Sequence, residues 1–256
     1  MSDPLRHVSS ASVGPWLPLE SNPALLNEVG LRWGLPAGYS FEEILGFSPD
    51  LLSMVQQPVQ AAVFLFPCTD AMYKYRASEH SRLPTPCPSY TTASSPPSPI
   101  LFLHQHSEFG NACGTIAAVH AISNACSSSL PSSSPVGSFA TTQRGKASAD
   151  VGRALLANAS LKSASDSVAS SDVAQTSCPG RDAAPLDHHF VAFVKGLTPG
   201  GGMRVLELDG TKKQPVDHGA CTPSDFLSRV GEVVQRIMAL DPDQIEYALI
   251  ALTGSS

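Results

Sequence analysis

The sequence predicts a mixed α/β (α+β) fold, because strand-like and helix-like segments alternate along one chain. Continuous apolar runs at 61–66 and 247–252 are typical of strands buried on both faces. Two more apolar strands, 190–194 and 203–208, flank a Pro-Gly-Gly-Gly turn and predict a hairpin. After Thr222-Pro223, which can cap a helix, apolar side chains recur at helical spacing. The chain therefore combines a sheet with packed helices.

The N-terminal part supplies an edge strand, two helices and a central strand. Residues 16–20 alternate in polarity around a proline, which cannot donate to a sheet ladder, and predict a short edge strand. Asn22-Pro23 and Ser48-Pro49 each place a capping side chain before a proline that suits the first helical position. The run at 61–66 lies between two prolines and predicts the central strand.

Three stretches are rich in Pro, Ser, Thr or Ala and poor in large apolar residues: 82–99, 127–146 and 163–184. Such segments bury too little apolar surface to offset the entropy of ordering them. We therefore predict loops that are the most mobile parts of the chain. A weak helical pattern at 151–156 separates the second stretch from the third.

Composition and charge exclude several classes of protein. A chain of 256 residues with 42% hydrophobic residues can bury a sizeable core, and we expect a single domain over 1–256. A net charge of −6 with 16 thinly spread Lys and Arg argues against a nucleic-acid partner. No apolar run approaches the roughly 20 residues of a membrane span, so no membrane partner is expected. Residues 1–14 lack the apolar core of a signal peptide, and we expect them to be flexible.

The cysteines indicate the compartment. Six cysteines are scattered without a CxxC pair, which fits neither a disulfide framework nor a zinc site. This favours a reducing, cytoplasmic location, with the nucleus as a second option. No heptad pattern or long exposed edge demands self-association, so we expect a monomer.

Cys113 is the most informative residue for function. It lies in the motif GNACGTI, where small residues precede an apolar run at 116–119 that predicts a helix. The unpaired N–H groups in the first turn of a helix carry partial positive charge and favour thiolate over thiol. A nucleophilic cysteine and a buried cysteine used only for packing are the two alternatives.

Five motifs follow one another along the chain: WLPLE at 16–20, LLSMV at 51–55, GNACGTI at 110–116, HF at 189–190 and ELDG at 207–210. Together they resemble the ubiquitin C-terminal hydrolases, a family of papain-like cysteine deubiquitinases, from Trp16 to Leu252. The resemblance implies a papain-like cysteine protease fold, with a central, mostly antiparallel sheet flanked by helices on both sides. It also implies thiol-dependent hydrolysis of ester, thioester, amide or peptide bonds at the C-terminal glycine of ubiquitin, without a cofactor.

The resemblance assigns roles to three residues. Cys113 matches the nucleophile, His189 the general acid and base, and Asp209 the carboxylate that orients the histidine. The predicted hairpin permits this, because His189 precedes one strand and Asp209 ends the next. His188 is an alternative base, but strand alternation sends neighbouring side chains to opposite faces, and His189 carries the His-Phe pattern of the family.

Gln105 resembles the glutamine of the family that donates a hydrogen bond to the oxyanion, together with the backbone N–H of Cys113. In this chain Gln105 lies two residues further from the cysteine than the family pattern has it. Either a strand bulge absorbs the extra residues and Gln105 still faces the site, which we favour, or the donor is displaced and catalysis is weakened. We expect His104 and His106 to be solvated loop residues.

The resemblance further implies that 163–184 forms an active-site crossover loop, which limits what can follow the C-terminus of ubiquitin. Its Ser- and Ala-rich composition predicts a mobile gate, and an inert insertion is the alternative. Ubiquitin, or a relative such as Nedd8, is the expected partner, with 17–19 and the surroundings of Cys113 as contact surfaces. An acidic surface would complement the basic face of ubiquitin, and Glu20 is the first candidate for it.

Two other classes of function stay open. The changed spacing between Gln105 and Cys113 prompts the hypothesis of a ubiquitin-binding module with weak catalysis or none. Eight histidines prompt the hypothesis of a metal site built from Cys and His. Neither a Cys/His pair at finger spacing nor an H-E-x-x-H motif occurs, so we expect no metal.

Overall fold

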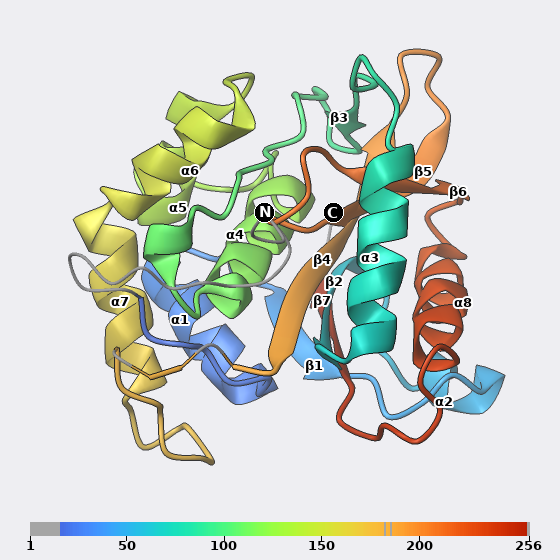
Figure 1. Ribbon diagram of the computed structural model, residues 1–256. Coiled ribbons are helices and arrows are strands. Elements are labelled where there is room, and N and C mark those ends of the chain that lie inside the picture. Colours follow the sequence, from blue (N-terminus) through green and yellow to red (C-terminus); the bar gives the residue numbers. More distant parts are fainter. Residues whose placement is uncertain (1–15, 182, 185, 255–256) are drawn as a thin grey trace.

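A computed structural model describes residues 16–181, 183–184 and 186–254 of the chain. The predicted flexible segment 1–14 lies outside these residues. One central sheet carries helices on both faces (Figure 1), which confirms the predicted α/β class and layering. None of the described helices is long and apolar enough to cross a membrane.

The sheet has the strand order β1-β7-β2-β4-β5-β6, and the short strand β3 pairs with β4 outside this path. The strands are β1 (Tyr39–Glu43), β2 (Val59–Pro67), β3 (Thr91–Thr92), β4 (His188–Leu197), β5 (Met203–Leu208), β6 (Val216–Ala220) and β7 (Ala248–Gly254). All neighbouring strands run antiparallel, as predicted. The apolar run at 61–66 lies in β2 at the centre of the sheet, and β4 and β5 form the predicted hairpin.

The helices divide between the two faces of the sheet (Figure 1). One face carries α1 (Pro23–Trp33), α4 (Cys113–Ala125), α5 (Pro135–Gln143), α6 (Ser148–Leu156) and α7 (Ala159–Ala169), and the other carries α2 (Pro49–Ser53), α3 (Asp70–Arg82) and α8 (Phe226–Met238). Each face has its own core, because successive side chains of a strand point in opposite directions. Val63 of β2 packs in the core that contains α4, and Phe64 packs in the core that contains α8.

Helix ends follow the capping signals at two of three predicted positions. Asn22-Pro23 and Ser48-Pro49 open α1 and α2, and each capping side chain accepts a hydrogen bond from a first-turn N–H. The prediction for the last helix was wrong by a few residues, because α8 begins at Phe226 after Asp225. Thr222-Pro223 instead forms a turn in which the Asp225 carboxylate accepts the Thr222 N–H at 2.6 Å.

The predicted edge strand at 16–20 is wrong. This segment lies beside the start of α4 and beside α7, away from the sheet, and its backbone donors find other acceptors. Trp16 N–H donates to the Phe109 carbonyl at 3.1 Å, and Leu17 N–H donates to the Asp166 carboxylate at 2.9 Å. The alternating pattern reflects burial against these elements, since Trp16 and Leu19 belong to the core.

Two of the three stretches predicted as mobile loops contain helices, and those predictions were wrong. Helix α5 lies within 127–146, and α7 covers the first part of 163–184. Ser134 and Asn158 cap these helices, and a few apolar residues at helical spacing bury one face of each. Small Ser and Ala side chains occupy positions between these apolar residues, so a low-complexity composition is compatible with packed helices. The helix at 151–156 is confirmed as part of α6.

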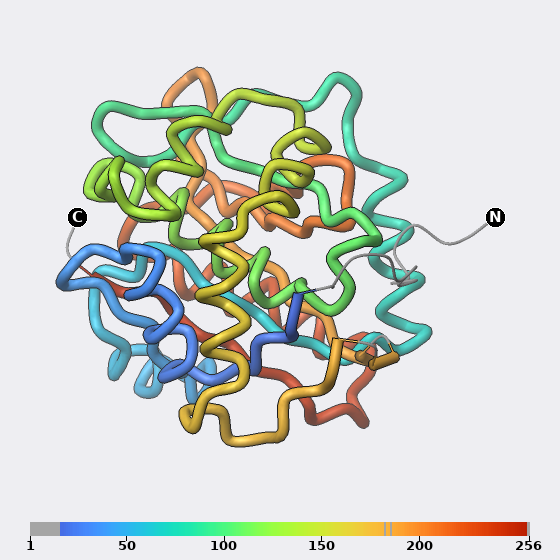
Figure 2. Tube along the Cα trace, turned by 90° about the vertical axis from the view of Figure 1, so that its left-hand side faces the viewer, coloured from blue at the N-terminus to red at the C-terminus, as the bar shows by residue number. Residues whose placement is uncertain are grey.

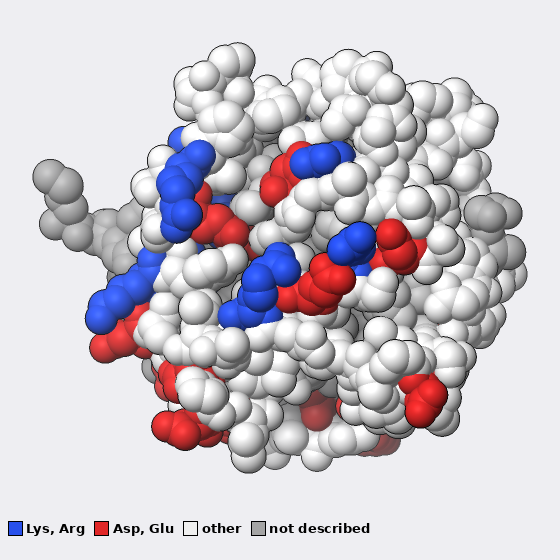
Figure 3. All heavy atoms as spheres, turned by 90° about the vertical axis from the view of Figure 1, so that its right-hand side faces the viewer, with Lys and Arg blue, Asp and Glu red and all other residues white. Residues whose placement is uncertain are grey.

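The face formed by α3 and α8 carries charges of both signs (Figure 3). Basic and acidic side chains lie next to each other there, as in the pairs Arg229–Glu232 at 3.1 Å and Arg204–Asp217 at 3.0 Å. In this view neither sign forms a continuous surface. Helix α3 and strand β1 were not predicted.

Candidate active site

Cys113 is the first residue of α4, a helix that is buried along almost its whole length. Its side chain is 8% exposed. A Cβ added to Gly114 would lie 3.2 Å from ring carbons of Phe190 and from the Leu19 carbonyl, so this glycine lets the helix start approach β4 closely. The cysteine therefore lies where the start of α4 packs against β4, the strand that carries His189.

Burial raises the pKa of the Cys113 thiol to about 11, although the N–H groups of Phe190 and Gly114 donate towards the sulfur and lower it. The first-turn N–H groups act in the predicted direction, but removal of the sulfur from water outweighs them. The thiol is protonated at neutral pH.

His189 and Asp209 form a buried pair. Nε2 of His189 donates to Oδ1 of Asp209 at 2.8 Å, and both side chains are fully buried. His189 is the second residue of β4 and Asp209 follows β5 directly, so the hairpin brings them together. Because Nε2 donates to the carboxylate, Nδ1 is the basic atom of the neutral ring.

His188 lies apart from this pair. Its half-exposed side chain is 3.2 Å from the Glu246 carboxylate, whereas the ring of His189 packs edge-on against Phe66. Strand alternation separates the two histidines as predicted.

Asp209 is held by more groups than the sequence indicated. Oδ2 accepts from Nη2 of Arg76 at 2.8 Å, and Oδ1 accepts from the N–H and the hydroxyl of Thr211 at 3.0 and 2.8 Å. Burial alone would raise the pKa of Asp209, but the charge of Arg76 and then the His189 ring hold it well below its usual range. The carboxylate is therefore ionised and fixed in orientation.

The same surroundings disfavour the protonated form of His189. Burial lowers the pKa of His189, the charge of Arg76 lowers it further, and Asp209 only partly opposes both. Burial therefore opposes the charged form of both Cys113 and His189.

Gln105 is buried and attached to the turn that carries Asp209. Its backbone N–H donates to the Gly210 carbonyl at 2.7 Å, and its Nε2 donates to the Gly110 carbonyl at 3.4 Å. A Cβ added to Gly210 would lie 3.1 Å from the Cβ of Gln105, so glycine lets the two segments approach without a shift. The extra residues before Cys113 form the 3₁₀ turn η1 (Ser107–Phe109) in place of the strand bulge that we favoured.

The segment before Gln105 is fixed along α4. The Asn124 side chain accepts the Leu101 N–H at 2.8 Å and donates to the Leu101 carbonyl at 2.9 Å. Nε2 of His120 accepts the Leu103 N–H at 3.1 Å, and burial lowers the pKa of His120 to about 4, which keeps it a neutral acceptor. The helix that begins with Cys113 therefore also positions the strand-like approach to Gln105.

Comparison with known proteins identifies the family. The model of ubiquitin carboxyl-terminal hydrolase, family 1, matches residues 16–239. The chain belongs to this family. A ubiquitin carboxyl-terminal hydrolase of Aplysia californica is 32% identical over 240 residues, which cover 91% of this chain and 99% of the relative. One of Drosophila melanogaster is 28% identical over 240 residues, which cover 94% and 98%.

Solved structures support the fold of this ubiquitin carboxyl-terminal hydrolase. The catalytic domain of Trichinella spiralis UCH37, crystallised with ubiquitin vinyl methyl ester, matches with a TM-score of 0.70 at 19% identity, covering 95% of this chain and 97% of that chain. A second structure of Trichinella spiralis UCH37 with the same ligand gives 0.65 at 18% identity, covering 94% and 83%. The predicted papain-like fold is thereby confirmed, and the family match shows a cysteine-type deubiquitinase.

The segment 163–184, which the resemblance assigns to a crossover loop, begins inside α7, because this helix continues to Ala169. Its remainder returns beside the N-terminal segment (Figure 2), where the Glu20 carboxylate accepts the Gln175 N–H at 2.9 Å. Near its end, Asn111 donates to the Ala184 carbonyl at 3.2 Å. A small cavity of about 170 Å³ separates the segment from Leu19. The segment thus lies next to the approach to Cys113.

His104 and His106 lie in a loop, as predicted, and are half-exposed. Their rings meet edge-on with centroids 5.0 Å apart, and His106 Nε2 lies 2.8 Å from the Ala149 carbonyl. Packing against the start of α6 covers part of both side chains.

Proposed function

We propose that the protein cleaves ester, thioester, amide or peptide bonds at the C-terminal glycine of ubiquitin, with Cys113 as nucleophile and His189 and Asp209 as its acid–base pair. The observation that carries this is the buried 2.8 Å contact between His189 and Asp209, next to a cysteine that begins the central helix. The names of the relatives, and the structural neighbour bound to ubiquitin vinyl methyl ester, support ubiquitin as the partner.

The first half of the reaction starts from neutral groups. Nδ1 of His189 accepts the thiol proton while the sulfur of Cys113 attacks the glycine carbonyl carbon, and the π electrons of the carbonyl move to its oxygen. Asp209 stabilises the imidazolium that forms. Proton transfer coupled to attack suits this site, because burial disfavours the isolated thiolate.

The second half regenerates the thiol. The bond from the carbonyl carbon to the leaving group breaks, the leaving group takes the proton from His189, and a thioester to Cys113 remains. A water molecule then attacks the thioester and gives a proton to His189. The sulfur departs and recovers that proton, and the free carboxyl terminus is released.

Gln105 is our candidate for the second oxyanion donor. Ala112 provides no capping hydrogen bond to the start of α4, so the first-turn N–H groups, including that of Cys113, are not occupied by a cap. The anchoring of Gln105 to Gly210 supports a fixed donor despite the changed spacing. One such donor contributes about 10²–10³ in rate.

The crossover segment, 170–184 after the end of α7, is our candidate for a gate on the leaving group. Its contacts to Glu20 and Asn111 support a position across the approach to Cys113. Glu20 is engaged by this segment, so its first role is to hold the loop, and an acidic ubiquitin contact is secondary to that.

The test is turnover of ubiquitin that carries a fluorogenic amide at its C-terminus. The wild type is expected to release the fluorophore, and Cys113→Ser is expected to abolish release. Cys126→Ser is the matched control, because Cys126 is a buried thiol directly after the other end of α4. Nedd8 with the same amide measures the preference between the two modifiers.

Tight binding of ubiquitin without turnover, and without an adduct to a ubiquitin electrophile, would overturn the proposal. That outcome would favour a ubiquitin-binding module.

A further inference from the structure

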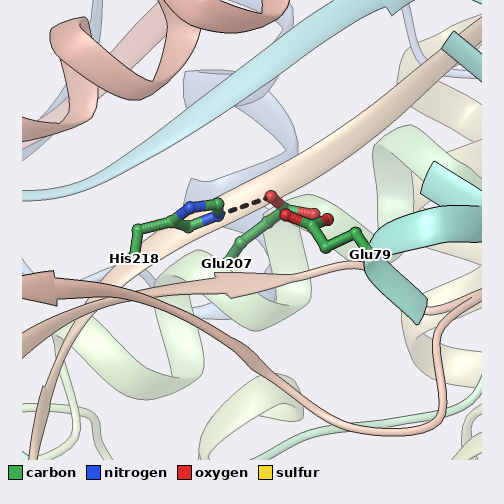
Figure 4. A group of neighbouring side chains, drawn as sticks. All are labelled: Glu79, Glu207 and His218. Atoms are coloured by element: carbon green, nitrogen blue, oxygen red, sulfur yellow. Dashed lines mark hydrogen bonds and ion pairs between the residues drawn. The ribbon is translucent and has the colours of Figure 1, made fainter. Parts of the chain in front are cut away.

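A second buried cluster of charges lies beside the Asp209 turn. Glu79 of α3, Glu207 of β5 and His218 of β6 converge there, and Figure 4 shows the Glu207 carboxylate between the His218 ring and Glu79. Nε2 of His218 lies 2.8 Å from Oε2 of Glu207. Within the described part of the chain, this is the group of three side chains whose metal-binding atoms lie within 4.8 Å of one another, and it contains no cysteine.

The cation of this cluster is a lysine. Lys212 is 1% exposed, and its Nζ is 2.6 Å from Oε1 of Glu207 and also pairs with Glu79. Two carboxylates thus share one buried ammonium, which provides the charge that a metal ion would otherwise bring. A fully buried lysine is expensive to desolvate and is stable only with such partners.

Lys212 is connected to the catalytic pair by two short paths. Along the chain, Glu207 and Asp209 are two residues apart and Lys212 follows after three more, and all three are buried. Through space, Arg76 and Glu79 lie three residues apart on α3, where side chains share one face. Arg76 binds Asp209 and Glu79 binds Lys212, so one helix face is attached to the Asp209 turn at two points.

We propose that Lys212 is a positioning residue for hydrolysis: by balancing Glu207 and Glu79 it keeps α3 docked on the Asp209 turn and leaves Arg76 to orient Asp209 towards His189. Lys212 acts through Asp209 and contacts no substrate. This inference rests on the roles proposed for His189 and Asp209.

Several other titratable groups surround His189 and Asp209. Those that face the pair or the cluster are Cys68, Tyr75, His80, His104, Cys113, His120 and His218. None of them is paired with both Glu207 and Glu79. Lys212 is also among the charges that lower the pKa of His189 and of Asp209.

The test compares two substitutions that change the buried charge in opposite directions. Lys212→Met removes a positive charge, so the pKa of His189 rises. In the pH profile of kcat/KM, the acidic limb should therefore move up by about 0.5 pH unit or more. Glu207→Gln removes a negative charge and moves the limb down. For Lys212→Met we expect kcat near pH 7 to fall about tenfold while KM stays the same, since the geometry of the pair is disturbed but no binding surface is changed.

Two further variants separate charge balance from general destabilisation. Glu207→Gln/Lys212→Met removes both charges and is expected to return the acidic limb to the wild-type position and to recover most of kcat. Lys213→Met is the matched control, because Lys213 is the exposed neighbour, and it should leave kcat and the limb unchanged. Thermal unfolding of each variant reports stability separately.

The outcomes are decisive in each case. The inference would be overturned if the acidic limb stays at its wild-type pH in both single variants. It would also be overturned if kcat of the double variant is no higher than that of Lys212→Met. If Lys212→Met does not fold, the downward shift in Glu207→Gln and the folding of the balanced double variant carry the test. An inactive wild type would refute the proposed function instead, whereas an active wild type with unshifted variants refutes only the role of Lys212.

Discussion

The two sides of the active site are built differently. On the hairpin side, His189, Asp209 and Arg76 are all buried, and Asp209 accepts hydrogen bonds from three residues. On the access side, the crossover segment is held by a few partly exposed contacts, such as Gln175 N–H to Glu20. Chemistry depends on charges whose geometry is fixed, whereas access depends on contacts that water can replace. Substitutions should therefore act on rate and stability on the first side, and on substrate range on the second.

The largest expected effect is that of His189→Ala. Loss of the base should lower kcat/KM for the ubiquitin amide about 10⁴-fold, because the thiol then has no group to take its proton. His188→Ala is the matched control and should stay within about twofold, since its contact with Glu246 is partly exposed. Comparable losses in both variants would contradict the assignment of His189.

Arg76→Met tests how far the hairpin side depends on buried charge. It leaves the Asp209 carboxylate buried without its cation, and we expect a loss of about 3–5 kcal/mol in the free energy of unfolding near neutral pH. The folded-state pKa of Asp209 is depressed, so this stabilisation is present above the ordinary pKa of aspartate and is lost as the pH falls through the folded value. The difference between wild type and variant should therefore narrow in acid, as measured by denaturant unfolding at several pH values.

Arg82→Met controls for the loss of an arginine from α3. Arg82 is exposed and bonds only within its own helix, to Ser78, in the described structure. Its substitution should change stability by about 0.5 kcal/mol or less. An equal loss in both variants would mean that Arg76 stabilises the helix rather than the Asp209 turn.

Gln105→Ala tests whether Gln105 belongs to the catalytic side of the site as an oxyanion donor. If the glutamine donates to the oxyanion, kcat should fall about 10²–10³-fold with little change in KM, measured by steady-state kinetics on the ubiquitin amide. A loss below about threefold would show that the residues added before Cys113 have moved the donor away. Gln143→Ala, on the exposed end of α5, serves as the control.

Apart from the control variants, the smallest effect on stability is expected on the access side. Replacing 171–181 by a short Gly-Ser linker should change the free energy of unfolding by about 1 kcal/mol or less, because loop-closure entropy varies slowly with length. The same change should raise turnover of ubiquitin linked to a folded protein relative to turnover of the small amide. An unchanged ratio of the two rates would refute the gate hypothesis and favour the alternative of an inert insertion.

The predictable features were those encoded locally. Continuous apolar runs and a glycine-rich turn were sufficient for β2, β7 and the hairpin, and through the hairpin for the approach of His189 to Asp209. Capping dipeptides located the starts of α1 and α2. Helix α7 was missed because of its many serines, and α5 because a serine-rich stretch at 127–134 precedes it, although both helices bury apolar residues at helical spacing.

Arg76 and Lys212 were missed for a different reason. Helix α3 buries only Met72 and Arg76, so its sequence resembles a solvated helix, and a charged residue there is normally exposed. The partner of Arg76 is Asp209, which is 133 residues away, and nothing local marks the pair. The spacing of Met72 and Arg76 on one helix face was the only signal in the sequence.

The hydrogen bond from Gln105 to the Gly210 carbonyl has a consequence for how this family can vary in length. The glutamine takes its position from the turn that carries Asp209, and the polypeptide between it and Cys113 is a separate connection. Residues can be added to or removed from that connection while both ends keep their places. Ser107 and Glu108 are the exposed residues of this connection, and they are a natural point at which to insert a reporter or a sensor peptide, whereas Phe109 and Gly110 are buried.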